Sequence, residues 1–295
     1  MELLRVRRPE WLRKKIYLNS EVLKTRRQIK DLGLHTICES AACPNIGECY
    51  ARGTASFLIL GDVCTRNCKF CNVKHGKPLP IDRDEGKKIG EYMRKNGIRY
   101  AVITSVTRDD ITDGGASHFV RVVEDIKSFV PSASIEVLVP DFKGRKDSVV
   151  EVLNADIEVF SHNLETVKHL YPTVRRGANY MRSLFVLELA KRYVKERLNR
   201  RIPIKTGIMV GLGESEEELL EIFDDIASIG VDVLTIGQYL RPGRENLPVV
   251  HYWTPEDFER FRVIAQEKGI PVVISGPYVR SSYLAEEAYE ESKSL

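Results

Sequence analysis

The sequence predicts an α/β protein whose mostly parallel β-sheet is covered by helices. Short apolar segments typical of buried strands recur along the chain, and segments with helical periodicity separate most of them. Alternation of this kind makes each helix the crossover between two parallel strands. The 295 residues are enough for one large domain of this type, and we see no linker or low-complexity tract that requires a second.

Six segments have the composition of strands that are buried on both faces. They are rich in Val, Ile, Leu and Phe, and polar or glycine-containing stretches bound them. The predicted strands are Phe57–Leu60, Tyr100–Thr104, Ile135–Val139, Ile157–Phe160, Ile204–Val210 and Val233–Tyr239.

Helical segments are marked by apolar spacing and by residues that favour helix ends. The first follows Ser20, which we expect to be its N-cap. The last combines Thr254 as N-cap with Pro255 at the first helical position. The remaining predicted helices are Asp82–Asn96, Ala116–Val130, Asn179–Leu198 and Glu214–Ile229. We expect residues 38–53 to form an irregular, cysteine-rich loop and Tyr278–Leu295 to form a polar tail.

Six or seven strand–helix units suit an incomplete (β/α) barrel, but a doubly wound open sheet shows the same alternation. Polar or glycine-rich segments directly follow most of the predicted strands. Because the carboxyl ends of parallel barrel strands share one face, we expect these segments to line one site. They are Cys64–Cys71, Arg108–Gly115, residues 162–165, Gly211–Glu214 and Arg241-Pro242.

Composition and charge favour a cytoplasmic protein outside the membrane. Hydrophobic residues make up 43% and charged residues 29%, no apolar run spans a bilayer, and the first residues lack the apolar core of a signal peptide. Residues 1–30 hold ten Lys or Arg against three Glu, although the whole chain has a net charge of +3. A solvated arm is the more common explanation of such a charge block, and the alternative that we predict is a docking surface for an acidic partner rather than for nucleic acid. The cations of this basic arm are Arg5, Arg7, Arg8, Arg13, Lys14 and Lys15.

All six cysteines lie between Cys38 and Cys71. Three disulfides would fit this number in a small secreted domain, whereas a large chain without a leader favours metal binding. Cys64, Cys68 and Cys71 form a C-x3-C-x2-C set directly after the first predicted strand. Three thiolates are one short of a closed structural zinc site, and they suit a cubane iron–sulfur cluster with one open iron.

An open iron of this kind can bind S-adenosylmethionine, and electron transfer then cleaves the sulfonium to a 5′-deoxyadenosyl radical. With Phe70 before the third cysteine, the spacing resembles the signature of the radical S-adenosylmethionine (radical SAM) superfamily. Cys38, Cys43 and Cys49 form a second set of three thiols. As a bare pattern it would also fit part of a zinc site, but its place just upstream favours a second cubane cluster. The fourth ligand of that cluster must come from elsewhere, because no cysteine remains.

Nearly the whole chain resembles the lipoyl synthases. The resemblance is carried by CESAACPNIGEC at 38–49 and GTASFLILGDVCTRNCKFCNV at 53–73. Further collinear blocks are RPEWL at 8–12, TSVTRDDITDGGASHF at 104–119, HNLETV at 162–167, VRRGANYMRSL at 174–184, KTGIMVGLGE at 205–214, TIGQYLRP at 235–242 and GPYVRSSY at 276–283.

The resemblance implies a partial (β/α)6 TIM-like barrel with N- and C-terminal extensions. The barrel would occupy residues 54–275, between an N-terminal extension of residues 1–53 with the auxiliary cysteines and a C-terminal tail of residues 276–295 with the RSSY motif. It also implies a sulfurtransferase of lipoate biosynthesis that uses S-adenosylmethionine and two [4Fe-4S] clusters. The enzyme would insert sulfur at C6 and C8 of an octanoyl chain carried on a lysine.

Ligand roles follow from the same resemblance. Cys64, Cys68 and Cys71 would hold the cluster that cleaves S-adenosylmethionine. A second, auxiliary cluster would donate the sulfur, with a serine as its fourth ligand. Its ligands would be Cys38, Cys43, Cys49 and Ser282. The implied partners are an octanoylated lipoyl carrier domain or H-protein-like carrier, an electron donor such as ferredoxin or flavodoxin, and an iron–sulfur carrier that rebuilds the auxiliary cluster.

Five residues are candidates for contacts with S-adenosylmethionine. Gly114 and Gly115 would let the backbone approach the methionine moiety, and Gly211 would lie on the adenosyl side; a turn accounts for these glycines equally well from sequence alone. Asn163 and Glu165 would reach the ribose hydroxyls or the cofactor amine.

Several other residues have weaker assignments or depart from the family pattern. We expect His162 to be a packed histidine, and Arg175, Arg176 and Arg241 to form surface ion pairs or to bind a carboxylate. The departures are Tyr50, where tryptophan is common, and Asn246, where histidine is expected. We expect neither to touch a cluster ligand.

Two other enzyme types and one other class of protein remain as alternatives. A sulfur-inserting enzyme resembling biotin synthase or a tRNA methylthiotransferase would share the first cysteine motif, but the RSSY motif and the N-terminal position of the auxiliary set argue against both. An electron-transfer iron–sulfur protein would need four cysteines for each cluster and little scaffold. Here each set has three cysteines and a large α/β body surrounds them.

Overall fold

The computed structural model describes residues 7–13 and 19–294 of the chain. Its main feature is an eight-stranded sheet in the order β1-β2-β5-β6-β7-β8-β9-β10. Neighbouring strands are parallel except for β1 and β2, which pair antiparallel. The strands are β1 His35–Thr36, β2 Ser56–Ile59, β5 Tyr100–Ser105, β6 Ser134–Leu138, β7 Val159–Ser161, β8 Ile204–Val210, β9 Val233–Gln238 and β10 Val272–Gly276.

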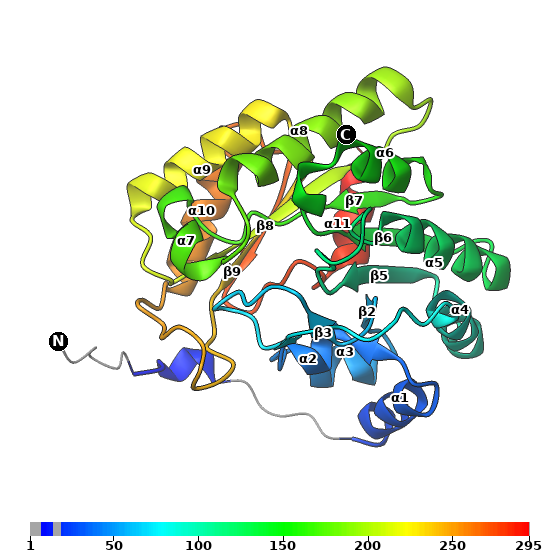
Figure 1. Ribbon diagram of the computed structural model, residues 1–295. Coiled ribbons are helices and arrows are strands. Elements are labelled where there is room, and N and C mark those ends of the chain that lie inside the picture. Colours follow the sequence, from blue (N-terminus) through cyan, green and yellow to red (C-terminus); the bar gives the residue numbers. More distant parts are fainter. Residues whose placement is uncertain (1–6, 14–18, 295) are drawn as a thin grey trace.

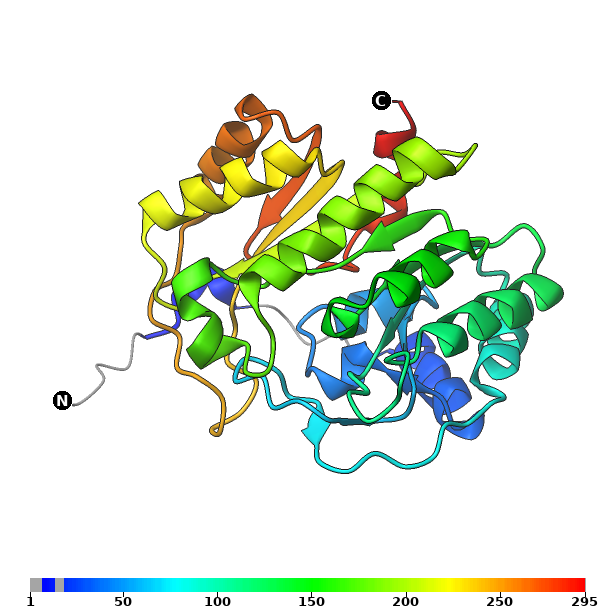
Figure 2. The same cartoon turned by 45° about the horizontal axis from the view of Figure 1, so that its top comes forward.

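Helices cover the outer face of this curved sheet, as Figures 1 and 2 show. In these described residues β1 and β10 do not pair with each other, so the sheet is an open, partial barrel. Its strands follow one another in chain order, without the reversal of order that marks a doubly wound sheet, so the structure confirms the predicted partial barrel and excludes the doubly wound arrangement. The outer helices are α4 Glu85–Asn96, α5 Ala116–Phe129, α6 Lys146–Asn154, α8 Tyr180–Arg197, α9 Glu216–Ile229 and α10 Pro255–Glu267.

The remaining elements are short or lie at the ends of the chain. Two short parallel strands pair with each other on either side of the loop Cys64–Cys71, and three turns are 3-10 helical. The elements are β3 Val63–Cys64, β4 Lys74–His75, η1 Glu10–Leu12, η2 Phe142–Gly144, η3 Lys168–Leu170, α1 Ser20–Asp31, α2 Ile37–Ser40, α3 Ile46–Ala51, α7 Tyr171–Val174 and α11 Ala285–Lys293. Within the described residues, no helix is both long and apolar enough to cross a lipid bilayer.

All six predicted strands are present, and the predicted helices agree to within a few residues. The N-cap of α1 was predicted wrongly. It is Asn19, whose side-chain Oδ1 accepts from the Val22 amide at 3.0 Å, so Ser20 is the first helical residue. The supposedly irregular loop of residues 38–53 contains α2 and α3. The prediction also omitted α6, the edge strand β1 and the last strand β10; of these, β1 has only two residues, too few to show a period.

The expectation of a polar tail for Tyr278–Leu295 was also wrong, because this segment contains α11. The buried residues of the helix are small: Ala285, Ala288 and Ser292. Ala288 packs in a cluster with residues of β9 and β10, and the Tyr289 ring lies 5.9 Å from that of Tyr100 in β5. Small side chains give no apolar stripe in a sequence, although they allow close packing.

Candidate cluster and cofactor site

A cavity of about 440 Å³ lies at the carboxyl ends of the parallel strands. This is the face on which barrel enzymes place their chemistry. Segments after β2, β5, β6, β7 and β9 contribute to the lining. Among the lining residues are Cys64, Cys68, Cys71, Thr107, Asp141, Asn163, Glu165, Arg175, Met209, Tyr239, Arg241 and Pro242. The structure therefore gathers most of the polar segments that were expected on one face.

The three thiols of the loop Cys64–Cys71 all line this cavity. All six cysteines of the chain are free thiols. Burial raises the pKa of Cys68 to about 11 and that of Cys71 to about 12. These thiols are therefore protonated in the metal-free chain near neutral pH, and binding a metal displaces their protons.

A smaller cavity of about 160 Å³ adjoins the first and contains the other cysteine set. Cys38, Cys43 and Cys49 line it together with Ser282 and Arg280. Four of these five residues also line the larger cavity, so the two cavities share a wall. The shared residues are Cys38, Cys43, Arg280 and Ser282.

The donor sets fit cubane clusters better than single ions. Within residues 7–13 and 19–294, no three Cys, His, Asp or Glu side chains converge on a point that one metal ion could occupy. A cubane cluster does not need such convergence, because each thiolate binds a different iron. The three thiols of the loop Cys64–Cys71, and the three auxiliary thiols with the hydroxyl of Ser282, match the soft ligands of iron–sulfur clusters.

The two serines of the RSSY motif have different surroundings. Ser282 lines both cavities, whereas Ser281 lines the larger one. The Ser281 hydroxyl accepts a hydrogen bond from Asn163 Nδ2 at 2.6 Å, and the same amide donates to Glu165 Oε1 at 3.0 Å. The Ser281 hydroxyl is therefore hydrogen-bonded to Asn163, which follows the end of β7. Ser282 instead lines the smaller cavity together with the auxiliary cysteines. This difference in surroundings distinguishes Ser282 from Ser281, a choice that rested on family resemblance alone in the sequence.

Glu165 is held in an unusual conformation at the wall of the larger cavity. Its φ of +68° lies in the left-handed region, which non-glycine residues adopt at a cost of order 1–3 kcal/mol. Burial raises the pKa of its carboxyl group, and the charge of Arg175 opposes that rise. Arg175 itself donates to the hydroxyls of Tyr171 at 3.1 Å and Ser183 at 2.8 Å. The cavity therefore presents a half-buried carboxyl group and a buried guanidinium cation, and Arg175 is no surface residue.

The three candidate glycines lie apart from the cavity. Gly114, Gly115 and Gly211 are not among its lining residues, and all three have positive φ. A Cβ at Gly115 would lie 2.4 Å from a methyl group of Leu60, and one at Gly211 would lie 2.1 Å from Gln238 Nε2. Backbone shape and close packing therefore account for glycine at these positions, and contacts with a cofactor stay a prediction.

Asn246 corrects one expectation. Its side-chain Nδ2 donates to the carbonyl oxygen of Cys71 at 2.9 Å, so this departure from the family pattern touches a predicted cluster ligand after all. The other departure, Tyr50, is fully buried, and its hydroxyl lies 2.8 Å from Thr36 Oγ1.

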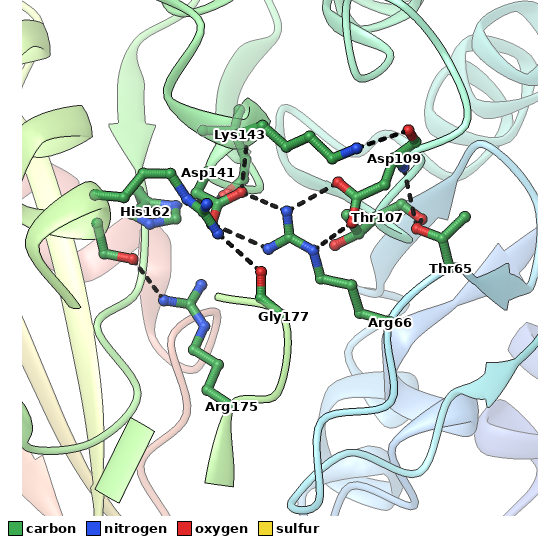
Figure 3. A network of polar contacts seen from close by, with 12 residues as sticks. Thr65, Arg66, Thr107, Asp109, Asp141, Lys143, His162, Arg175 and Gly177 are labelled. Carbon is green, nitrogen blue, oxygen red and sulfur yellow. Dashed lines mark hydrogen bonds and ion pairs between the residues drawn. The ribbon is translucent and has the colours of Figure 1, made fainter. Parts of the chain in front are cut away.

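Residues that the sequence reading assigned no role are prominent around the site. Arg66 lies within the cysteine motif, and Asp109 and Asp141 follow β5 and β6; Figure 3 shows these three side chains together. Arg280 precedes the two serines on the shared wall, and burial lowers the pKa of its guanidinium. The available signal was position, because an ionisable residue directly after a barrel strand falls on the functional face.

His162 lies next to the side chains of Arg66 and Asp141 and is fully buried. Its Nδ1 lies 2.8 Å from the carbonyl oxygen of Val139, so Nδ1 carries the proton and donates it, while Nε2 has no hydrogen-bond partner among the described residues. Burial, together with the charge of Arg175, lowers the pKa of the imidazole to about 3. The packed neutral histidine expected from the sequence agrees with this geometry.

Acid is expected to destabilise the fold through His162. Because the folded pKa of about 3 lies below the unfolded value of about 6.5, the neutral ring stabilises the fold fully above pH 6.5. That contribution, at most roughly 5 kcal/mol, is lost as pH falls from about 6.5 towards 3. Asparagine at this position can still donate to Val139 but does not titrate. Unfolding midpoints measured against pH should therefore fall less steeply for His162→Asn than for the unchanged chain. An equal slope in both, or an equal change in the exposed control His75→Asn, contradicts this assignment.

Comparison with known proteins agrees with the geometry. The profile of the Radical SAM superfamily matches residues 58–226. The lipoyl synthase of Caldicellulosiruptor saccharolyticus is 50% identical over 285 residues, which cover 97% of this chain and 98% of the relative. The lipoyl synthase of Parabacteroides distasonis is also 50% identical, over 282 residues, covering 96% and 98%.

A solved structure supports the fold. Streptococcus suis SuiB bound to precursor peptide SuiA matches with a TM-score of 0.57 and 12% identity, over 79% of this chain and 52% of that chain. The present chain thus spans about half the length of SuiB, and at this identity the likeness concerns the fold alone. The curated relatives match over nearly the full length, and the superfamily profile covers both the first cysteine motif and more than half of the chain. The chain therefore belongs to the lipoyl synthase family within the radical SAM superfamily.

Proposed function

We propose that this chain inserts two sulfur atoms into a protein-bound octanoyl chain, using one cluster in each of the two adjoining cavities. The observation that carries this proposal is the shared wall. Cys38, Cys43 and Ser282 face both the auxiliary cavity and the cavity of the other cysteine set. A group held by the auxiliary cysteines is thereby exposed to the space in which a substrate would be activated.

Each donor set would hold one [4Fe-4S] cluster. Cys64, Cys68 and Cys71 would hold the cluster that binds S-adenosylmethionine; the auxiliary ligands would be Cys38, Cys43, Cys49 and Ser282. When bound, these groups supply reductive cleavage of S-adenosylmethionine, hydrogen abstraction from carbon, and sulfur. An alkoxide is a harder ligand than a thiolate and suits iron less well, so Ser282 would be the auxiliary ligand that is released most easily.

The chain's own residues would bind and orient the reactants in the larger cavity. Arg175 is a buried cation on its wall, suited to a carboxylate such as that of S-adenosylmethionine, and Glu165 is a half-buried acceptor for an amine or hydroxyl. Apolar side chains complete the lining and would exclude water from an alkyl chain: Leu58, Val106, Leu138, Met209 and Tyr239.

Partners and location are part of the same proposal. The substrate would be an octanoylated carrier domain, and the reductant and the cluster-rebuilding carrier would be separate proteins in the cytoplasm, where thiols stay reduced. Arg8 lines the larger cavity, which supports a role of the basic arm at its entrance. Arg7 and Arg13 are also described, whereas Arg5, Lys14 and Lys15 lie outside the described residues.

Mass spectrometry of an octanoyl-lysine carrier peptide after anaerobic turnover tests this function. Protein loaded with clusters, reductant and S-adenosylmethionine should convert the peptide to the species with two added sulfur atoms. Peptide that stays octanoylated while 5′-deoxyadenosine accumulates would refute sulfur insertion and leave the superfamily chemistry intact.

Replacing Ser282 with alanine should make the auxiliary cluster labile. Chelator treatment is expected to lower the iron content from about eight to about four per chain, because one of two cubanes is lost. Formation of 5′-deoxyadenosine should persist. The amount of sulfurated product should fall at least about tenfold, because loss of a ligand contact worth about 1.4 kcal/mol corresponds to that factor. Ser294→Ala, at the exposed end of α11, is the matched control. Unchanged iron and product in Ser282→Ala would exclude the serine as a ligand.

A further inference from the structure

Arg66 stands midway between Cys64 and Cys68, and its side chain is only 6% exposed. Its guanidinium faces two carboxylates at once, as Figure 3 shows. Towards Asp109, Nε and Nη2 donate at 2.7 and 2.9 Å. Towards Asp141, Nη1 and Nη2 donate at 3.0 and 2.7 Å. The planar fork of arginine thus makes two bidentate contacts, a geometry that the point charge of lysine cannot reproduce.

The two carboxylates belong to different strand ends. Asp109 follows β5 and Asp141 follows β6, so one side chain of the cysteine loop joins two neighbouring strands of the barrel. Asp141 also accepts from Arg182 Nε of α8 at 2.8 Å and from the backbone amide of Lys143 at 3.1 Å. Two arginines therefore face two aspartates, and their charges balance.

Asp141 is completely buried, so its charge depends on these partners. Burial alone would favour the protonated acid. The hydrogen bonds and charge of Arg66 outweigh burial, and with help from Arg182 they keep the pKa of the carboxyl group well below its ordinary range. Breaking the contact with Arg66 would leave the buried Asp141 carboxylate without its main counter-charge, which costs free energy. Local opening of this contact is therefore unfavourable.

Further hydrogen bonds, most of them to or from the backbone, hold the same loop against the segment that follows β5. Thr65 donates from its amide and its hydroxyl to the carbonyl oxygen of Thr107, at 3.0 and 2.9 Å. The Asp109 amide returns a bond to the Thr65 hydroxyl at 3.0 Å. The Arg66 amide lies 3.4 Å from Cys64 Sγ and donates to it. A donor to a ligand sulfur influences the reduction potential of a cluster on that ligand.

We propose that Arg66 is a positioning residue, which clamps the Cys64–Cys71 loop onto the carboxyl ends of β5 and β6 and so fixes the orientation of its cysteines. The clamp acts through the cysteines, because four of the five N–H donors of the guanidinium are engaged with Asp109 and Asp141. The proposal rests on the proposed function in one respect, namely that these cysteines hold the cluster that binds S-adenosylmethionine.

Thiol labelling of the metal-free full chain tests the clamp without any cluster. Arg66→Lys should raise the alkylation rates of Cys68 and Cys71 at least about tenfold, because one lost charge-assisted hydrogen bond of about 1.5 kcal/mol corresponds to that factor. The auxiliary cysteines of the same molecule are the internal control, and their rates should stay unchanged. Arg260→Lys is the matched variant, since Arg260 also contacts two carboxylates but lies on α10. Equal rates in Arg66→Lys and the unchanged chain would overturn the clamp.

The loaded enzyme provides a second readout that general loss of stability would not produce. In Arg66→Lys and Asp109→Asn, the reduced cluster should show a shifted midpoint potential and an altered paramagnetic resonance spectrum on addition of S-adenosylmethionine. Loaded Arg260→Lys should match the unchanged enzyme in both. If the unchanged enzyme shows no cluster that responds to S-adenosylmethionine, the proposed function fails, and labelling still decides the clamp. If it responds and both variants respond identically, the positioning role is excluded.

Discussion

Alanine at Cys68 is expected to abolish formation of 5′-deoxyadenosine. Cys68 is one of three thiols in the loop after β2, and a cubane held by two thiolates has lost the anchoring that leaves a single iron open. Turnover should fall to background, a loss of at least about 10⁴-fold, because the rate enhancement that depends on the cofactor disappears with it. Product analysis of anaerobic reactions by mass spectrometry measures both 5′-deoxyadenosine and sulfurated peptide.

Cys43→Ala provides the reciprocal control. Cys43 belongs to the auxiliary set, so 5′-deoxyadenosine should still form, while no sulfurated peptide appears. Each variant should retain about four irons per chain, because each keeps one complete cubane site. If both variants lose 5′-deoxyadenosine equally, the two cysteine sets do not hold separate clusters. The assignment of S-adenosylmethionine cleavage to one set and sulfur donation to the other would then be wrong.

Removal of Lys205 is expected to destabilise the fold more than any surface change. Its Nζ lies 2.9 Å from Glu136 Oε1, and these two side chains are 2% and 1% exposed. Glu136 also accepts from the hydroxyls of Tyr100 at 2.9 Å and Ser161 at 3.0 Å. Lys205→Ala leaves the carboxylate buried without its counter-charge, which costs about 3–5 kcal/mol. Thermal unfolding should shift down by roughly 5–8 °C.

Replacing both Lys205 and Glu136 distinguishes the free-energy cost of an unpaired buried charge from the contribution of the ion pair to stability. Lys205→Met with Glu136→Leu fills the same space with apolar side chains, and it should recover most of the stability lost in Lys205→Ala. The exposed pair of Lys87 and Asp84 is the control, since Lys87→Ala should change the midpoint little. A double variant as unstable as the single one would mean that packing, rather than charge, sets the loss.

Much of the fold could be predicted because its signals are local. Six parallel strands were visible as apolar runs, and the predicted helix ends at Asn96 and Ile229 are confirmed, each followed by a glycine with positive φ. The edge strand β1 and the helix α11 were missed because two residues carry no period and because Ala285 and Ala288 carry no apolar stripe. Their place depends on neighbours far along the chain.

The sequence by itself determined the chemistry of this protein. Spacing within Cys64–Cys71 and within Cys38–Cys49 is a property of consecutive residues, so two sets of soft ligands could be read without coordinates. Only the tertiary structure decided that the two sets share a wall with Ser282, and that Arg66 reaches Asp109 and Asp141. The physical reason is that a parallel sheet brings its strand ends together across long stretches of chain, and local patterns do not record which side chains meet there.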